Sequence, residues 1–406
     1  MIFCIGMLGL LDVLVNFYFA SLGNNPETIG LLQSLPRLSG FLTSVPLGFL
    51  TNRIGTRRML IFSTIGCVLA IWLQLIPVLP MLAISRFLFG LTYGAQQIAI
   101  APRIVEMIES RQRTRFFALH NLLTMGAMAF GSFIGGYLPG WLTTATQTLV
   151  PAQWTASATT PYAYGIAIFV AGLISLIGII PMLDLRARTV KTDTPPRAPF
   201  TAASFSASVA KMPWLMLALA ALPMLTFGFS GGLTFPFYNL FWREQFGLAD
   251  QSVGTILSIG WIGMAAIPLI NSTLESRFGR TGTLRLMMIL SAIAFLVLGL
   301  LPALLISVGA FIIAISGRNT MNPLFQPLVL ESLPPSLSNI ASSMMMVMWN
   351  IGWFAATAMG GFIVERFGYG MVMMLAALSV LLTGFSIPMI FRQPGILAKR
   401  LAQQSG

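Results

Sequence analysis

The stretch that decides the fold reads GFLTNRIGTRR and runs from Gly48 to Arg58. It lies between two long apolar runs and places three arginines, Arg53, Arg57 and Arg58, within eleven positions. Because arginine side chains are excluded from hydrocarbon, this loop marks one face of a membrane. A connection this short must turn sharply, which glycine permits at Gly48 and Gly55. Taken alone, the stretch could also be an ordinary basic connector on the positively charged side of a membrane protein.

The same kind of loop occurs a second time, 224 residues further on, where residues 272–282 read STLESRFGRTG. At this offset Arg53 corresponds to Arg277, and Gly55 corresponds to Gly279. Further coincidences at offsets of 224 or 225 are spread over most of each half: Gly23 with Gly247, Gly30 with Gly254, Leu50 with Leu274, Pro102 with Pro327, Glu106 with Glu331, Gly135 with Gly360 and Gly136 with Gly361. The chain is therefore a tandem duplication of two parallel repeats.

The first loop resembles the loop between the second and third helices of the major facilitator superfamily, whose pattern is roughly G-x-L-a-D-R-x-G-R-R. Asn52 stands where that pattern has aspartate. The positions that fit are Gly48, Leu50, Arg53, Gly55, Arg57 and Arg58. The resemblance implies an all-α membrane protein with twelve transmembrane helices, built as two six-helix bundles related by a pseudo-two-fold axis. It also implies a secondary active transporter that moves a small molecule by alternating access, and not an enzyme.

Composition independently places the chain in a lipid bilayer. Charged residues make up 8% and apolar residues 56% of the chain, and apolar runs of about 20 residues predict spanning helices. The net charge of +12 could indicate nucleic acid, but 18 of the 23 lysines and arginines fall in segments that we assign to the cytoplasm. This asymmetry is an orientation signal, so we expect a cell-membrane protein with both termini in the cytoplasm and no nucleic-acid partner.

The chain offers little for metal or redox chemistry. Its two cysteines, Cys4 and Cys67, lie in apolar runs, and His120 is its single histidine. We therefore expect no disulfide framework, no metal site and no cofactor. A phosphate-binding loop of the form G-x-x-x-x-G-K-[ST] is absent from the sequence, which argues against nucleotide-driven transport. We expect a monomer, and the first apolar run does not have the features of a cleavable signal. Because the sequence starts inside this run, a cytoplasmic tail could precede it.

The apolar runs and their punctuation predict four segments along the chain. Residues 1–183 form the N-terminal six-helix bundle, and residues 214–391 form the C-terminal one. The proline-containing, basic stretch 184–213 is a cytoplasmic linker, and 392–406 is a basic cytoplasmic tail. We expect the uncharged stretch 139–161 to lie at the outer membrane interface, with helices on either side of it.

One carboxylate, Asp12, is expected near the middle of the membrane, about halfway along the first helix. A charge at this depth costs a few kcal/mol unless it is paired, protonated or hydrated. Asn16 lies one turn further on, on the same helix face. Two interpretations stay open: Asp12 pairs with an arginine to hold helices together, or it is a proton or cation site. The resemblance favours the second, since the first helix lines the central cavity in that family.

Polar residues on the second and fourth helices extend this site. Arg37 follows Gln33 by one turn, and Arg86 opens a stretch similar to the superfamily pattern R-x-x-x-G-x-x-x-A/G, from which a role in proton coupling is implied. The alternative for Arg86 is a structural arginine bonded to facing carbonyls. The face that Arg86 begins continues through Gly90, Gly94 and Gln97. We assign Asp12, Arg37 and Arg86 to proton coupling, and Asn16, Gln33 and Gln97 to substrate binding.

The C-terminal half has no carboxylate within its predicted spans, but it carries amides, aromatic residues and Arg318. Such groups among apolar walls suit a small amphiphilic or weakly anionic substrate, with Arg318 as the anion partner. Interfacial aromatic residues and ordinary packing are the alternative for most of them. The substrate-binding residues predicted in this half are Tyr238, Asn239, Arg318, Asn322, Trp349 and Trp353.

The stretch GSFIGGYL, Gly131–Leu138, resembles the antiporter pattern G-P-x-x-G-G, with Ser132 in place of proline. On this ground we expect proton-coupled export of the kind seen in drug:proton antiporters. The alternatives are proton-coupled uptake of a sugar, organic acid or amino acid, and a receptor or scaffold that has lost transport.

In the family that it resembles, the basic loop clasps the two halves on the cytoplasmic side when the protein is open outward. Glu106 and Glu109 are the acids available to its arginines in this chain. The residues assigned to gating are Asn52, Arg53, Gly55, Arg57, Arg58, Glu106, Arg277 and Gly279.

Overall fold

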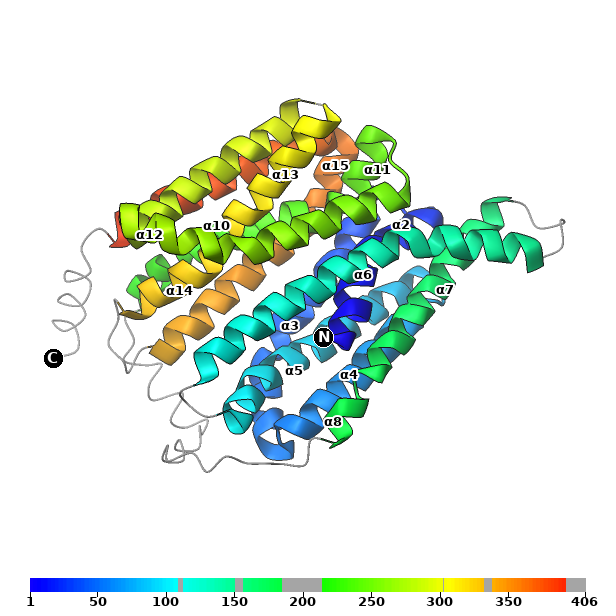
Figure 1. Ribbon diagram of the computed structural model, residues 1–406, viewed down its shortest axis with the longest axis horizontal. Coiled ribbons are helices and arrows are strands. Elements are labelled where there is room, and N and C mark those ends of the chain that lie inside the picture. Colours follow the sequence, from blue (N-terminus) through cyan, green and yellow to red (C-terminus); the bar gives the residue numbers. More distant parts are fainter. Residues whose placement is uncertain (109–111, 150–155, 185–213, 302, 332–337, 392–406) are drawn as a thin grey trace.

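The computed structural model describes residues 1–108, 112–149, 156–184, 214–301, 303–331 and 338–391, and its regular structure is helical throughout these ranges (Figure 1). The helices of the first half are α1 (Ile2–Cys4), the π-helix η1 (Ile5–Leu10), α2 (Leu11–Ser21), α3 (Pro26–Ile54), α4 (Thr56–Leu73), α5 (Leu79–Met107), α6 (Arg113–Leu149), α7 (Ala156–Ile177) and α8 (Ile180–Asp184). The second half comprises α10 (Trp214–Thr234), the 3-10 helix η3 (Phe235–Phe237), α11 (Tyr238–Phe246), α12 (Asp250–Leu300), α13 (Leu304–Asn319), α14 (Met321–Glu331) and α15 (Ser338–Phe391).

Glycines with positive φ divide the longest helices into separate membrane crossings. Gly279 (φ 68°) lies within α12 and Gly368 (φ 77°) within α15, and each interrupts the helical backbone. Gly55 (φ 87°) separates α3 from α4 at the position equivalent to Gly279. Glycine adopts these angles without the steric cost that a Cβ brings. With these breaks the described helices form twelve crossings, which confirms the predicted all-α architecture.

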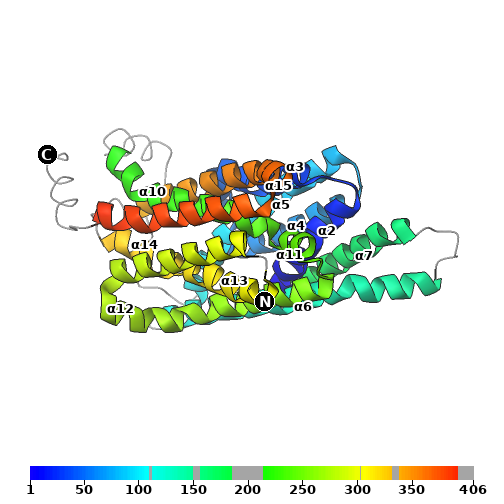
Figure 2. The ribbon, with the colours of Figure 1, turned by 90° about the horizontal axis from the view of Figure 1, so that it is seen from above.

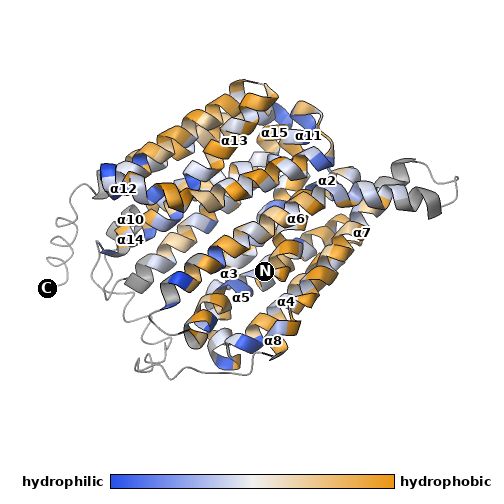
Figure 3. Cartoon of the chain, viewed as in Figure 1, coloured by the Kyte–Doolittle hydropathy of each residue, from blue (hydrophilic) through white to orange (hydrophobic). Residues whose placement is uncertain are grey.

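The crossings lie side by side along one common direction, and hydrophobic residues cover most of their length (Figures 2 and 3). Seven stretches of the described residues are individually long and apolar enough to span a membrane. Below, the end of the bundle at which α2 is followed by α3 is called the Gly23 end. The opposite end, at which α3 is followed by α4, is called the Gly55 end.

The most extensive contacts between the two halves are made by two helix pairs. α3 packs against the first part of α15, and α6 packs against the first part of α12 (Figures 1 and 2). A Cβ added to Gly30 would lie 2.9 Å from Gly361 Cα, and one added to Gly136 would lie 3.0 Å from Gly254 Cα. All four glycines belong to the repeated pairs of the sequence, so small residues allow close backbone approach between the halves near the Gly23 end.

Several boundaries differ from those expected. α6 continues through Pro139 to Leu149, so the interfacial segment predicted for 139–161 is largely helical where it is described. The first crossing of the second half, which begins at Trp214, is interrupted by η3, whose Pro236 lacks the N–H that a continuous helix requires. The predicted linker 184–213 and tail 392–406 lie outside the described residues apart from Asp184.

Candidate functional site

A chain of hydrogen bonds between polar side chains crosses from the first half to the second near the middle of the helices. Arg86 of α5 donates to Gln33 Oε1 of α3, and Gln33 Nε2 donates to Asn16 Oδ1 of α2. Asn16 Nδ2 donates to Asn239 Oδ1 of α11 at 2.9 Å and also to the Pro236 carbonyl. Asn16 and Asn239 are each 2% exposed. The sequence placed all four side chains in the site, and the structure brings them into contact.

Asn239 occupies its position because the backbone changes course just before it. The 3-10 turn of η3 interrupts the α-helical backbone between α10 and α11, and α11 packs against α2. The amide Nδ2 of Asn239 donates to the carbonyls of Asp12 at 3.1 Å and Val13 at 3.0 Å, while its Oδ1 accepts from the Leu240 N–H at 2.9 Å. The amide therefore ties α11 directly to the backbone of α2 around Asp12.

Asp12 faces the second half of the protein. Its Oδ2 accepts a hydrogen bond of 3.1 Å from Trp261 Nε1 of α12, and among the described residues it has no ion-pair partner. Ten residues separate Asp12 from the end of its helix at Leu22, a rise of about 15 Å, which corresponds to the middle of a bilayer core of about 30 Å. In this conformation an indole, not an arginine, contacts the carboxylate.

Arg37 of α3 lies against two tryptophans of α15. Its guanidinium carbon is 4.6 Å from the ring centroid of Trp349 and 4.4 Å from that of Trp353, and both contacts cross between the halves. The two indoles pack edge to face with centroids 5.2 Å apart. Cation–π contacts of this kind contribute about 0.5–2 kcal/mol, depending on how far they are desolvated.

Arg318 lies close to the same aromatic residues but is bound differently. Its Nε donates to Ser230 Oγ at 2.8 Å and its Nη2 to the Phe227 carbonyl at 2.6 Å, both on α10. The residue is 4% exposed, and its guanidinium carbon lies 4.1 Å from the Phe227 ring centroid and 5.8 Å from that of Trp353. Its polar contacts are therefore largely within its own half.

The remaining predicted binding residues are dispersed. Tyr238 is buried, its hydroxyl has no partner in the described part of the chain, and its ring packs edge-on against Phe311. Asn322 is exposed and donates to Asn319 Oδ1 at 2.9 Å. Gln97 is exposed on α5, one turn from Tyr93, and belongs to none of the polar contacts between the halves given above.

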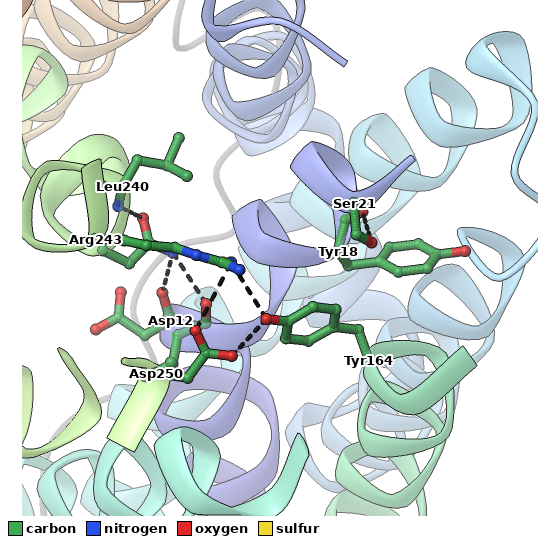
Figure 4. A network of polar contacts seen from close by, with 9 residues as sticks. Asp12, Tyr18, Ser21, Tyr164, Leu240, Arg243 and Asp250 are labelled. Carbon is green, nitrogen blue, oxygen red and sulfur yellow. Dashed lines mark hydrogen bonds and ion pairs between the residues drawn. The ribbon is translucent and has the colours of Figure 1, made fainter. Parts of the chain in front are cut away.

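A second polar cluster, at the Gly23 end, was not predicted from the sequence (Figure 4). Tyr164 of α7 donates through its hydroxyl to Asp250 Oδ2 of α12 and accepts from Arg243 Nη1 of α11 at 3.2 Å. Arg243 and Asp250 approach to 3.7 Å, and the Arg243 guanidinium carbon is 4.6 Å from the centroid of the Phe17 ring of α2. This cluster, named the seal network below, bonds the first half to the second.

Local backbone signals explain where the charges of the seal network lie. Gly247 ends α11 in the left-handed conformation (φ 63°), and α12 begins at Asp250. Arg243 is thus in the last turn of one helix and Asp250 in the first turn of the next, where each complements the helix dipole. Tyr164 could not be identified from the sequence, because nothing in its apolar run distinguishes it from a packing residue.

The predicted gating residues are placed at the Gly55 end. Arg57 donates to the carbonyls of Met182 at 3.0 Å and Leu183 in α8, which belongs to its own half. Arg53, Arg58 and Arg277 are exposed. The side chains of Asn52 and Glu106, and the whole of Glu109, lie outside the described residues, so the predicted clasp stays a prediction. Next to Gly279, Arg280 pairs with Glu275 at 3.0 Å and with Glu331 at 2.7 Å.

The stretch that resembles the antiporter pattern is a packing surface. Ser132 Oγ donates to the Gly9 carbonyl at 3.2 Å. A Cβ on Gly131 would lie 2.4 Å from the Ile5 carbonyl oxygen and 2.8 Å from Gly9 Cα. Gly136 faces the other half, at Gly254. In the part of the chain that the structure describes, no group of three histidine, cysteine or carboxylate side chains could hold a metal ion.

Comparisons with known proteins agree with this geometry. The family model described as "Major Facilitator Superfamily" matches residues 1–357 and 231–404. A structure of a mutant of the nucleoside transporter NupG superposes with a TM-score of 0.74 at 13% identity, covering 96% of this chain and 98% of that one. A bacterial homolog of the human lysosomal transporter Spinster, in an inward-facing and unoccupied conformation, gives 0.70 at 12% identity, covering 99% and 96%. The niacin transporter NiaP of Acinetobacter baylyi is 24% identical over 135 residues, which are 33% of this chain and only 31% of that protein.

Proposed function

The chain belongs to the Major Facilitator Superfamily, and from that premise we propose that it couples the movement of a small molecule to the movement of protons through Asp12. It is a multi-pass membrane transporter and not an enzyme. One observation carries the proposal: the carboxylate of Asp12 lies near mid-membrane, where Trp261 of the opposite half contacts it and no ion pair neutralises it among the described residues.

This placement gives a proton a way to change the contact between the halves. An ionised carboxylate accepts a charge-assisted hydrogen bond, which is roughly twice as strong as one between neutral groups. Protonation of Asp12 would therefore weaken its bond from Trp261, which joins α2 to α12. Asn239 holds the backbone of the same turn, so the two contacts act on one segment. Proton binding would thus favour a different arrangement of the two halves.

Alternating access needs a contact between the halves that can break. The glycine pairs and the seal network supply such a contact at the Gly23 end, through α3 with α15, α6 with α12, and α7 with α11 and α12. The distribution of basic residues supports assigning the Gly55 end and both termini to the cytoplasm, with the protein in the cell membrane. We propose a monomer, because the two halves of one chain provide both sides of the site.

The direction of transport is a separate part of the proposal. The glycines of Gly131–Leu138 support proton-coupled export, although Ser132 replaces the proline of the antiporter pattern. The printed names of similar proteins, a niacin transporter and a nucleoside transporter, support a small organic substrate. Uptake with a proton, or a receptor without transport, would be recognised by the sign or the absence of the coupled proton flux.

The test is proton flux in proteoliposomes containing the purified protein, against a panel of organic anions, cations and neutral molecules. We expect one class to drive a flux, and Asp12→Asn to abolish uphill transport while downhill exchange continues. Glu27→Gln, which makes the same change of carboxylate to amide near the Gly23 end, is the control and should keep uphill transport. Undiminished uphill transport by Asp12→Asn in a pH gradient would exclude Asp12 as the proton carrier.

A further inference from the structure

Arg37 differs from the other two mid-membrane arginines in its hydrogen bonding. Arg86 donates to Gln33 through Nη2, although its buried Nε has no partner in the described chain, and Arg318 is bonded to Ser230 and to a backbone carbonyl. Arg37 forms no hydrogen bond or ion pair with any described residue, and its contacts are the two indole faces of α15. A guanidinium carries five N–H donors, and at this depth unpaired donors are costly. Arg37 as a whole residue is partly buried.

The charge around Arg37 is unbalanced. None of the three guanidiniums has a carboxylate partner among the described residues, and Asp12, the one mid-membrane carboxylate, accepts from Trp261. The ion pairs of Arg243 and Arg280 lie at the two ends of the bundle. Arg37 and Arg318 both face the ring of Trp353, within 4.4 Å and 5.8 Å of its centroid. An anion placed there would experience attraction from both cations in a medium of low dielectric constant.

The walls beside Arg37 are flat and aromatic. Trp349 and Trp353 pack edge to face. The ring centroid of Phe235 lies 5.6 Å from that of Trp353 and 6.0 Å from that of Trp261. The indole N–H of Trp261 donates to Asp12. The indole Nε1 of Trp349 is buried and has no partner in the described part of the chain. Trp349 Nε1 and the Arg37 guanidinium are thus two unpaired donor groups in one cluster of side chains, and a single ligand with acceptor atoms would pair with both.

We propose that Arg37 and the Trp349–Trp353 pair together form a site for a small aromatic monocarboxylate. One guanidinium lacks partners, and its planar fork matches one carboxylate in a bidentate pair. The neighbouring rings of Trp353 and Phe235 offer aromatic contacts to the ring of the ligand, and Trp349 Nε1 is a further donor. The site draws Arg37 from one half and both tryptophans from the other, so the ligand contacts both halves at once. This inference rests on the proposed transport function, whose substrate class it specifies.

The experiment is equilibrium binding to the purified protein at fixed pH, measured by isothermal titration calorimetry and by quenching of tryptophan fluorescence. The probes are benzoate, its neutral amide benzamide, and the non-aromatic cyclohexanecarboxylate. We expect benzoate to bind and the other two probes to bind at least about tenfold more weakly. Benzamide lacks the negative charge, and cyclohexanecarboxylate lacks the aromatic ring. Absence of benzoate binding to the folded protein, or equal binding of benzamide, would overturn the proposal.

Variants assign the binding to this site. Arg37→Gln should weaken benzoate binding about 10- to 100-fold, and Arg37→Lys should recover part of it, because lysine keeps the charge but loses the fork. The matched control is Arg366→Gln, which removes an exposed arginine stacked on Phe362 at 4.5 Å, away from the site. Unchanged benzoate affinity in Arg37→Gln would refute the assignment.

The outcome is separable from that of the transport proposal. Binding at fixed pH without a gradient does not require proton coupling, so loss of binding in Arg37→Gln supports the site even if Asp12→Asn remains coupled. Conversely, a coupled flux driven by a neutral or cationic compound, with no benzoate binding, would leave transport standing and exclude the aromatic carboxylate.

Discussion

Alanine substitution at Gly254 should open the Gly23 end of the bundle. A Cβ there would lie 2.6 Å from the Ser132 carbonyl oxygen and 2.7 Å from Gly136 Cα, both in the opposite half. At Gly136 it would lie 2.6 Å from the Asp250 carbonyl oxygen. Because the clashing atoms belong to backbone, they cannot rotate away, and the two helices must separate.

The magnitude follows from the cost of overpacking, about 1–3 kcal/mol for an added methyl group in a tight contact. The penalty falls on the conformation in which α6 and α12 touch and is relieved when they part. Since 1.4 kcal/mol is a factor of ten, the population should shift about 5- to 150-fold toward the state open at the Gly23 end. The gain in helix propensity from glycine to alanine, about 1 kcal/mol, applies to both states and cancels.

The assay is double electron–electron resonance between spin labels at Arg58 and Phe278, both exposed at the Gly55 end, in a background with Cys4 and Cys67 replaced by alanine. We expect the label distances to shorten in Gly254→Ala and Gly136→Ala as the Gly55 end closes. Gly126→Ala on α6 is the control, because a Cβ there meets no atom within 4 Å. Wild-type distance distributions in both test variants, with the protein folded and monodisperse, would refute the reasoning.

Four further substitutions, with Arg58→Ala as a control, test three other contacts. Tyr164→Phe removes the hydroxyl that joins Asp250 to Arg243. The same labels should report a population shift of up to about tenfold toward the state open at the Gly23 end. An unchanged distance distribution would show that the hydroxyl does not hold the halves together. Arg57→Ala leaves the last carbonyls of α8 without their donor and should lower the stability by about 1–2 kcal/mol in thermal unfolding, whereas the exposed neighbour Arg58→Ala should not. Asn52→Asp should increase the population of the state closed at the Gly55 end by a factor of a few, because the added charge gains about 0.3–1 kcal/mol of helix-dipole interaction. Arg53→Ala should decrease that population. If neither substitution changes the label distances, the predicted clasp is excluded.

The sequence predicts the fold well because its signals are local. The paired glycines at 55 and 279 both require positive φ, and both separate the second crossing of a half from the third. Asp12, Asn16, Gln33 and Arg86 could be selected because polar side chains are conspicuous in apolar helices. Helix interruptions were less predictable: Pro236 begins a 3-10 turn, whereas Pro139 is accommodated within α6.

What the sequence could not supply is the pairing between halves. Asn16 and Asn239 are 223 positions apart, and their contact depends on how η3 redirects α11. Arg318 is predicted to meet an anion, and the structure adds that two of its nitrogens already donate to α10, whereas Arg37 has no such bonds to the described residues. The rotation of each helix about its axis decides whether an arginine finds hydrogen-bond partners within its own half. The periodicity of the sequence alone does not fix that rotation.

The polar groups of the interface therefore divide by how completely they are paired. At the Gly23 end each charge of the seal network has a partner in the described chain, and the glycines bring backbones into contact, so this end is stable without a ligand. Near mid-membrane, Arg37 and the indole N–H of Trp349 lack such partners. Unpaired donors raise the free energy of the conformation that buries them. A ligand that pairs with these donors lowers the free energy of the conformation in which Arg37 and the tryptophans face each other, and of no other. The unpaired donors that lower the stability of the protein without a ligand thus make the arrangement of the two halves depend on ligand binding. Alternating access requires this dependence.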